Sequence, residues 1–177
     1  RKGKGGFYRL NRENGGKVKE AINLQTGEYA PQARAPEISG PAGKGDLAAL
    51  MATPGKVGEY AWAILGPTLS YAASIVPEAT KTVLGVDDAM KLGYNWKAGP
   101  FEMIDRLGAP YLVQRLEAEG RPVPEILRVA GDRPFHRIEG GRRQFLGLDG
   151  EYHDVVRPEG VLRLEDVKLS ARPLLKN

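Results

Sequence analysis

The sequence predicts a mainly helical domain with a basic N-terminal arm and a small β-hairpin tail. A long series of helix-forming segments with cap and stop signals runs from residue 46 to residue 131. The chain of 177 residues suits one domain with arms, and its 23 Gly and 13 Pro exceed ordinary usage, which indicates linkers and turns. We therefore expect an arm and linker over 1–45, a helical domain over 46–131, and a tail with a connector over 132–177.

The arm carries the positive charge of the chain. Residues 1–20 hold seven basic and two acidic side chains, whereas the other residues hold 19 basic and 20 acidic ones. A nucleic-acid-binding protein is expected to carry a basic face on its folded part, so we expect no nucleic-acid partner and interpret the arm as a solvated tail. Residues 21–45 mix Pro, Gly and polar residues, which predicts an irregular linker.

The longest apolar stretch spans residues 57–76. Its two adjacent apolar faces predict a helix that is buried on most sides. Residues 60–77 carry no charge, but Gly66 and Pro67 interrupt the stretch, so we predict a core helix and no membrane span. Pro67 is expected to kink the helix or to remove one of its hydrogen bonds.

Cap and stop residues predict five shorter helices. Asp46 is the expected N-cap of the first one, and Pro100 takes the favoured first position of the third. An Asp cap and a Gly stop bound the second. The predicted helices span residues 47–52, 86–93, 100–107, 110–119 and 124–129.

The pattern changes after residue 132. Residues 135–139 and 142–148 flank two glycines and predict a β-hairpin with a tight turn. A second turn leads to a strand over 152–156. The alternation in residues 161–164 predicts one more strand.

Composition and motifs exclude several kinds of site. The chain contains no cysteine, which rules out disulfides, Cys-ligated metals and thiol catalysis and fits a reducing, cytoplasmic location. The dinucleotide-binding fingerprint fails because Tyr8 stands at its third glycine. The phosphate-loop pattern fails because Gly45 follows Lys44 where Ser or Thr is required.

Four carboxylates on the predicted helices are candidates for acid–base chemistry. Glu102 falls in a first helical turn, where backbone N–H groups and the helix dipole favour a negative side chain, and Asp87 is a ready cap. We therefore interpret the group as structural, with the acid–base role as the alternative. The four residues are Asp87, Asp88, Glu102 and Asp105.

The two histidines and two tryptophans are also interpreted as structural. His136 and His153, the latter next to Asp154, fall on predicted strands without a nucleophile nearby, so we expect surface residues. Trp62 and Trp96 are expected in the core. The chain is thus expected to hold no catalytic, cofactor-binding or metal-binding residue.

Residues 86–108 resemble the C-terminal helical domain of the 3-hydroxyacyl-CoA dehydrogenase family. The family pattern combines a D-x-A-M helix, a G-x-x-W/P-x-x-G-P-F turn and a helix with D-x-x-G. Residues 1–9 are similar to the K-x-G-x-G-F-Y segment that closes the first helical domain in this family. The matching positions are Asp87, Ala89, Met90, Gly93, Trp96, Gly99, Pro100, Phe101, Glu102, Asp105 and Gly108.

The resemblance implies a second helical domain of a multifunctional fatty-acid β-oxidation protein. The parent reaction would be the NAD-dependent oxidation of 3-hydroxyacyl-CoA to 3-ketoacyl-CoA. The family's catalytic His–Glu pair and its NAD site lie in a domain that these residues do not include. The helix over 60–76 also has no Asn in place of the substrate-contacting Asn of the first domain. The resemblance therefore implies a structural role, in scaffolding, in closing the substrate cleft and in self-association.

The implied partners are other parts of the same protein. They are an NAD-binding domain, a first helical domain, an enoyl-CoA hydratase domain and the acyl-CoA substrate, together with a second molecule in a homodimer. NAD would be a cofactor of the full-length protein and not of this chain. The alternative is a stand-alone helical interaction module that binds a partner protein through a surface around Trp62 and Tyr71.

Overall fold

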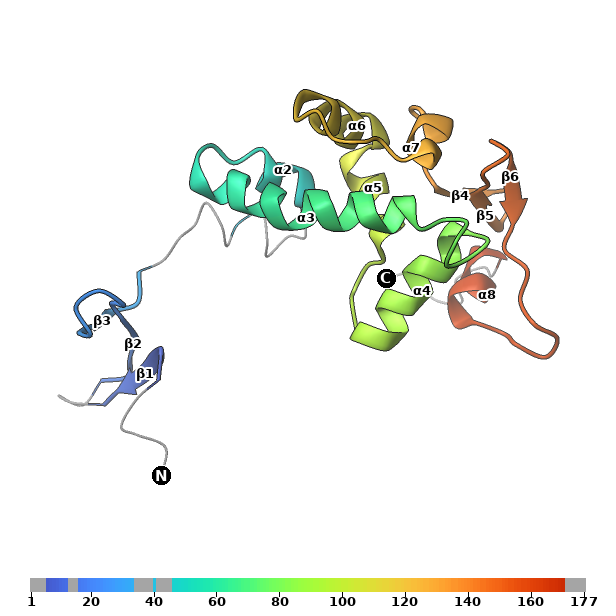
Figure 1. Ribbon diagram of the computed structural model, residues 1–177. Helices are drawn as coiled ribbons and strands as arrows, with labels where there is room; N and C mark the ends of the chain where they lie inside the picture. The colour runs from blue at the N-terminus through green and yellow to red at the C-terminus, as the bar shows by residue number, and fades with distance from the viewer. Residues whose placement is uncertain (1–5, 13–15, 34–39, 41–45, 171–177) are drawn as a thin grey trace. The chain divides into compact units, whose positions relative to one another are not determined.

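The computed structural model describes residues 6–12, 16–33, 40 and 46–170. The chain divides into two compact units, Arg1–Gly40 and Pro41–Asn177. Within the described residues, the first unit holds three strands, and the second holds seven helices and three strands (Figure 1). The predicted dominance of helix in the second unit is confirmed.

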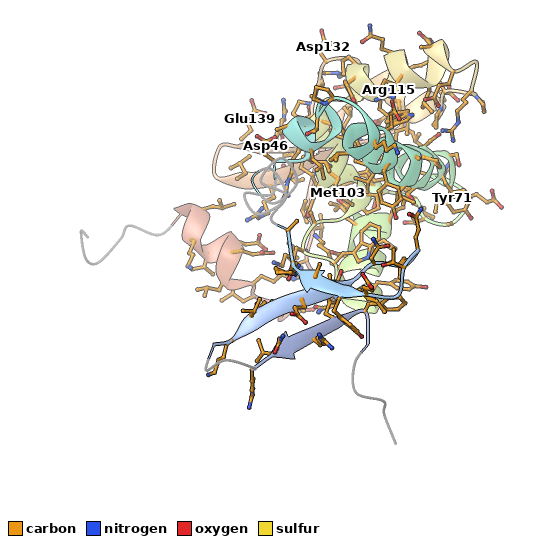
Figure 2. All side chains as sticks on the ribbon, turned by 90° about the vertical axis from the view of Figure 1, so that its left-hand side faces the viewer. Asp46, Tyr71, Met103, Arg115, Asp132 and Glu139 are labelled. Atoms are coloured by element: carbon orange, nitrogen blue, oxygen red, sulfur yellow. The ribbon has the colours of Figure 1, made fainter. Side chains whose placement is uncertain are left out.

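The first unit is an antiparallel sheet. The side chain of Asn23 accepts hydrogen bonds from the backbone N–H groups of Gln25 and Thr26, at 2.9 and 3.3 Å, and so forms the turn between the last two strands. Side chains project from both faces of this sheet (Figure 2). The strands, in the order in which they pair, are β1 (Tyr8–Asn11), β2 (Val18–Ile22) and β3 (Tyr29–Pro31).

The prediction of an arm and an irregular linker is therefore wrong for these strands. Each strand has three to five residues, and only short alternations mark them in the sequence. Gly40 is described, but the remainder of the Gly/Pro run, over 41–45, lies outside the described residues.

Two helices of the second unit begin where the sequence signals predict. The Asp46 side chain accepts a hydrogen bond from the backbone N–H of Ala49 at 2.9 Å and caps α2. Pro100 is the first residue of α5. The helices are α2 (Leu47–Met51), α3 (Lys56–Ser74), α4 (Val83–Tyr94), α5 (Pro100–Leu107), α6 (Ala109–Ala118), α7 (Glu125–Ala130) and α8 (Leu164–Ser170).

The short helix α5 lies at the centre of the second unit. It contacts α2, α3, α4, α6 and the first strand of the tail. Phe101 and Ile104 on α5 are fully buried. The ring of Phe101 meets the ring of Phe135 edge to face, with 4.8 Å between centroids. The core is thus built around α5, which places its N-terminal turn beside α4.

The long helix α3 is buried on one side, not on most sides as predicted. Leu69 and Ala72 face the core, whereas Tyr60, Ile64 and Tyr71 are 71%, 52% and 68% exposed. The helix continues through Pro67, which is itself exposed. No helix among the described residues is long and apolar enough to cross a membrane.

The two tryptophans differ. Trp62 is buried, as predicted, and the guanidinium of Arg115 stacks 4.2 Å from the centre of its ring. The indole N–H donates a hydrogen bond to Glu119. Trp96 is only half-buried and lies outside the hydrophobic core cluster, so the prediction of a core residue is wrong for it.

Helix α4 begins and ends elsewhere than the sequence suggested. It starts at Val83, three residues before the predicted start, and ends at Tyr94, not at Gly93; its C-cap Asn95 takes the left-handed conformation with φ of 56°. Asp87 therefore lies inside α4 and cannot cap that helix. Its carboxylate is directed to α5 instead.

The tail forms a second antiparallel sheet, and its hairpin is confirmed. The strands are β4 (His136–Glu139), β5 (Arg142–Leu146) and β6 (Tyr152–Asp154), paired in that order. Residues 161–163 form no strand, and helix α8 begins at Leu164. Glu165 and Asp166 in the first turn of α8 favour a helix there, and they outweigh the short alternation that predicted a strand.

Candidate functional site

Asp87 is the cap of a helix that it does not belong to. Its Oδ1 accepts a hydrogen bond from the backbone N–H of Phe101 at 2.8 Å, and its Oδ2 accepts one from Glu102 at 3.2 Å. These N–H groups open α5 and have no partner within that helix. A Cβ on Gly99 would lie 2.3 Å from Asp87 Cγ, so the carboxylate fits only against a glycine.

Glu102 completes the same cap, as the sequence predicted. Its Oε2 accepts a hydrogen bond from the backbone N–H of Gly99 at 3.0 Å, and Lys91 Nζ lies 2.5 Å from Oε1. Burial would raise the pKa of Glu102, but the bonds from Lys91 and Gly99 outweigh it and hold the pKa below its usual value. Glu102 is therefore an ionised partner of Lys91.

Asp105 ties α5 to the tail. Its carboxylate accepts hydrogen bonds from the backbone N–H groups of Phe135 and His136, at 2.6 and 2.9 Å. The same carboxylate lies 2.8 Å from Nδ1 of His136. Asp105 thus fixes the start of β4 against the helical body.

His136 lies between two carboxylates and is not the surface residue that the sequence predicted. Its Nε2 is 3.2 Å from Asp87 Oδ2, an ion-pair distance without the alignment of a hydrogen bond. Burial would lower the pKa of His136, but the contacts with Asp105 and Asp87 outweigh it and raise the pKa to about 9. The ring is therefore protonated at neutral pH and cannot accept a proton there as a general base.

The other candidates are engaged on the surface. Asp88 Oδ1 lies 3.7 Å from Lys91 Nζ. His153 is exposed, as predicted, and pairs with Asp149 at 2.8 Å. Asp154, although next to His153 in sequence, bonds Arg142 and Gln144 instead.

The sequence analysis grouped the carboxylates but missed their histidine. Asp87, Glu102 and Asp105 do converge, as the alternative of a catalytic cluster requires. His136 joins them from 31 residues beyond Asp105, across a helix-to-strand contact that no local pattern marks. The spacing of the four in the chain carries no signal that could have found it.

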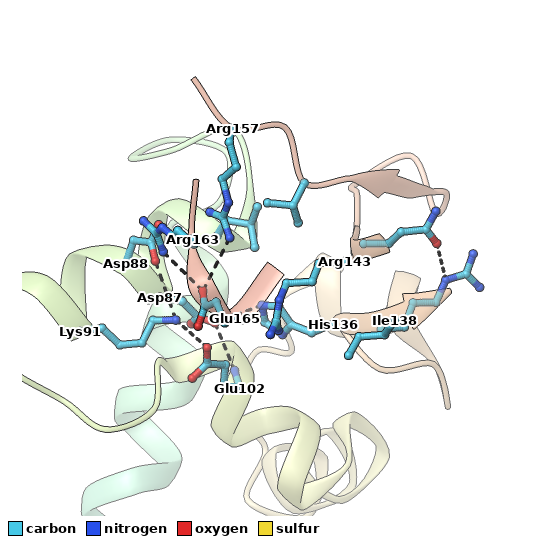
Figure 3. A pocket seen from close by; sticks show the side chains of 14 residues that line it. Asp87, Asp88, Lys91, Glu102, His136, Ile138, Arg143, Arg157, Arg163 and Glu165 are labelled. Carbon is cyan, nitrogen blue, oxygen red and sulfur yellow. Dashed lines mark hydrogen bonds and ion pairs between the residues drawn. The ribbon is translucent and has the colours of Figure 1, made fainter. Parts of the chain in front are cut away.

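A pocket of about 330 Å³ opens beside this cluster, between α4, the tail sheet and α8 (Figure 3). Its lining mixes cations and carboxylates. Asp87, Glu102 and Lys91 form one wall, and side chains from β5 and α8 face them. The lining residues are Leu84, Asp87, Asp88, Lys91, Glu102, His136, Arg137, Ile138, Arg143, Gln144, Val155, Arg157, Arg163 and Glu165.

Within the described ranges, no group of three or more His, Cys, Asp or Glu residues could hold a metal ion. The carboxylates of the cluster are already bound to backbone N–H groups, Lys91 or His136. Chemically, the cluster can hold α4, α5 and β4 together. Its geometry provides no free base and no nucleophile.

Comparison with known proteins matches the helical body to one family. Residues 60–128 match the family profile described as 3-hydroxyacyl-CoA dehydrogenase, C-terminal domain. This match confirms the resemblance that residues 86–108 suggested. No solved structure matches the chain.

Two of the curated relatives are much longer than this chain. The "Putative fatty acid oxidation complex trifunctional enzyme" of Rickettsia felis is 34% identical over 142 residues, which cover 78% of this chain and 19% of the relative. The "Probable 3-hydroxyacyl-CoA dehydrogenase" of Bacillus subtilis is 30% identical over 137 residues, which cover 76% and 17%. The chain therefore spans less than a fifth of each of these two relatives.

Proposed function

Because residues 60–128 match the C-terminal domain of the 3-hydroxyacyl-CoA dehydrogenase family, we propose that this chain is a non-catalytic C-terminal part of such an enzyme. The parent would oxidise 3-hydroxyacyl-CoA to 3-ketoacyl-CoA with NAD, in fatty-acid β-oxidation. This part would serve as a scaffold, close the substrate cleft and support association. It would be a second helical domain in a multifunctional protein.

One observation carries the proposal. The charged residues at matching positions form structural contacts within the fold: Asp87 and Glu102 cap α5, and Asp105 anchors β4. The one histidine that joins them is held protonated between Asp87 and Asp105. Hydrogen bonds to backbone N–H groups already engage oxygens of these carboxylates, which supports a structural role for them.

The cofactor and the partners belong to the proposed parent. NAD would be bound by an NAD-binding domain, and a first helical domain and an enoyl-CoA hydratase domain would accompany it in a cytoplasmic protein. The lengths of the relatives support this, because more than four fifths of each lies outside the matched region. The acyl-CoA substrate would be shared by the whole assembly.

Enzyme assays test the proposal. The isolated chain should form no NADH from 3-hydroxybutyryl-CoA, whereas the long protein that contains it should. In the long protein, Glu102→Gln should reduce stability and leave turnover per folded molecule unchanged. Turnover by the isolated chain, or loss of turnover in a stably folded Glu102→Gln protein, would contradict the structural role.

Self-association is a second candidate function, favoured by the exposed face of α3. Tyr60, Ile64, Pro67 and Tyr71 recur at alternating steps of four and three residues, and no charge interrupts them. A seam with this spacing suits an antiparallel helix from a second molecule of the chain. The surface that the sequence analysis placed around Trp62 and Tyr71 is corrected here, since Trp62 is buried.

Light scattering tests this association. Tyr71→Lys should shift the chain from dimer to monomer without loss of helix. Leu92→Lys is the matched control, because Leu92 is also exposed and lies on α4, away from the α3 face. A wild-type chain that is monomeric at high concentration would rule the dimer out.

A further inference from the structure

Two arginines of the pocket converge on one carboxylate. Arg143, on β5, lies with Nε 2.9 Å from Asp166 Oδ1, and Arg157 lies with Nε 3.0 Å from Oδ2. The hydrogen bond from Arg157 is the main reason that the pKa of Asp166 stays below its usual value. This side chain is therefore an anion. One anion therefore bridges two guanidinium groups.

The neighbouring carboxylate of α8 faces one of these arginines and a third one. Glu165 Oε1 lies 3.8 Å from both Arg157 Nη2 and Arg163 Nη1 (Figure 3). Arginine presents planar N–H donors that match the oxygens of carboxylates and phosphates alike. Helix α8 thus places two carboxylates where a ligand with several anionic oxygens would be recognised.

The charges of the lining favour an anion once α8 is removed. Six cationic groups line the pocket, since His136 is protonated, against four carboxylates, of which one is Glu165 on α8. Without α8, six cations face the three carboxylates Asp87, Asp88 and Glu102. The cations are Lys91, Arg137, Arg143, Arg157, Arg163 and His136.

Helix α8 is held weakly enough to detach from β5 and the pocket. It has seven residues, packs on β5, and none of its described side chains is fully buried. Leu164 at its start is largely exposed. Partly exposed ion pairs contribute little to stability and weaken with salt. The contact between α8 and the pocket therefore depends mainly on charge and not on apolar burial.

We propose that Arg143 and Arg157, which line this pocket, bind a phosphate group and that the carboxylates of α8 occupy their N–H donors as internal competitors. Asp166 stands in the place of the phosphate between Arg143 and Arg157. A phosphate offers more oxygens and more negative charge than one carboxylate, so it can displace α8 and take over its arginine contacts. The pocket, which Arg143 and Arg157 line together with Glu165, adds about 330 Å³ of free space for part of the molecule that carries the phosphate.

Removing the internal carboxylates tests the site. The variant Glu165→Gln/Asp166→Asn should bind inorganic phosphate at least about ten times more tightly than the wild type in a calorimetric titration. Adding Arg143→Gln to it should abolish the gain. The matched control is Glu151→Gln/Glu159→Gln, which removes the same charge from exposed positions outside the pocket and should bind like the wild type.

A second measurement uses the unaltered chain, in case the variant misfolds. Trypsin cleavage after Lys168, which lies inside α8, requires this helix to unwind. Phosphate should accelerate this cleavage relative to chloride at equal ionic strength, and Arg143→Gln should remove the difference. Equal cleavage in both salts, or a folded variant with no gain in phosphate affinity, would overturn the proposal.

Titration with coenzyme A as a second ligand shows whether the site recognises free phosphate or a phosphate carried by a larger molecule. If coenzyme A binds the variant far more tightly than inorganic phosphate does, the site recognises a phosphorylated carrier. Equal affinities indicate the free anion. Both outcomes support the site, and neither depends on the dehydrogenase function proposed above.

Discussion

Different interactions stabilise the interior of each of the two units of the chain. Among the described residues of the helical unit, the core contains nineteen buried hydrophobic residues, with Phe101 and Phe135 among the largest. In the sheet of the first unit, the one described residue that is buried is Glu20, which pairs with Arg9 at 2.6 Å and accepts a bond from Asn11 at 3.0 Å. The comparison teaches that the stability of the helical unit rests on buried apolar side chains, whereas that of the sheet rests on a charged pair and its hydrogen bonds.

The largest expected effect comes from removing core volume. Phe101→Ala should lower the free energy of unfolding by about 3–5 kcal/mol, because the ring is fully buried against Phe135. Chemical denaturation measures it, with exposed Leu92→Ala as the control. A loss as small as that of the control would mean that the centre of the unit lies elsewhere.

The next effect tests whether charge also matters in the helical unit. The pKa of His136 rises from 6.5 to about 9 on folding. Its stabilisation is therefore complete below pH 6.5 and is lost as the pH rises toward 9; it amounts to about 3 kcal/mol. Denaturation at pH 6 and pH 9.5 measures the loss. His136→Gln should remove this part of the pH dependence, and an unchanged profile would contradict it.

A smaller effect is expected at the cap of α5. Glu102→Ala should cost about 1 kcal/mol, because Asp87 still binds two of the N–H groups. The same denaturation experiment ranks it against Phe101→Ala. If Glu102→Ala were the more damaging, the cap and not the core would organise this unit.

The smallest effect on the whole chain is expected from the sheet. The bonds from Asn11 and then Arg9 hold the pKa of Glu20 below its usual value, so its contribution is present above that usual value and is lost as the pH falls through the lowered one. Glu20→Gln should loosen β1 and β2, seen by amide hydrogen exchange. Amides of α5 should be unaffected, and a response there would show that the units are coupled.

The sequence predicted those parts of the fold that are decided locally. Caps such as Asp46 and the Gly99-Pro100 start of α5 act within a few residues, so their spacing is visible in the chain. The interpretation of Glu102 as a structural residue followed from its place in a first turn. These predictions needed no knowledge of distant neighbours.

What the sequence could not predict depends on distant contacts. The pairing of Arg9 with Glu20 across β1 and β2, and that of His136 with Asp105, joins residues 11 and 31 positions apart. Asp87 was assigned to the wrong helix for the same reason, since its partners lie on α5. At α8, two alternating leucines predicted a strand although the acidic first turn favours a helix.

The contact between Asp87 and Gly99 has a consequence for how such sequences diverge. Any side chain at position 99 would collide with the carboxylate, and a residue without a carboxylate at position 87 would lose the bonds from the N–H groups of Phe101 and Glu102. Neither residue can be replaced alone, because a single replacement removes the cap that Asp87 provides for α5. We expect the two residues to be inherited as a pair, with an exchange at one tolerated only in descendants that have already changed the other.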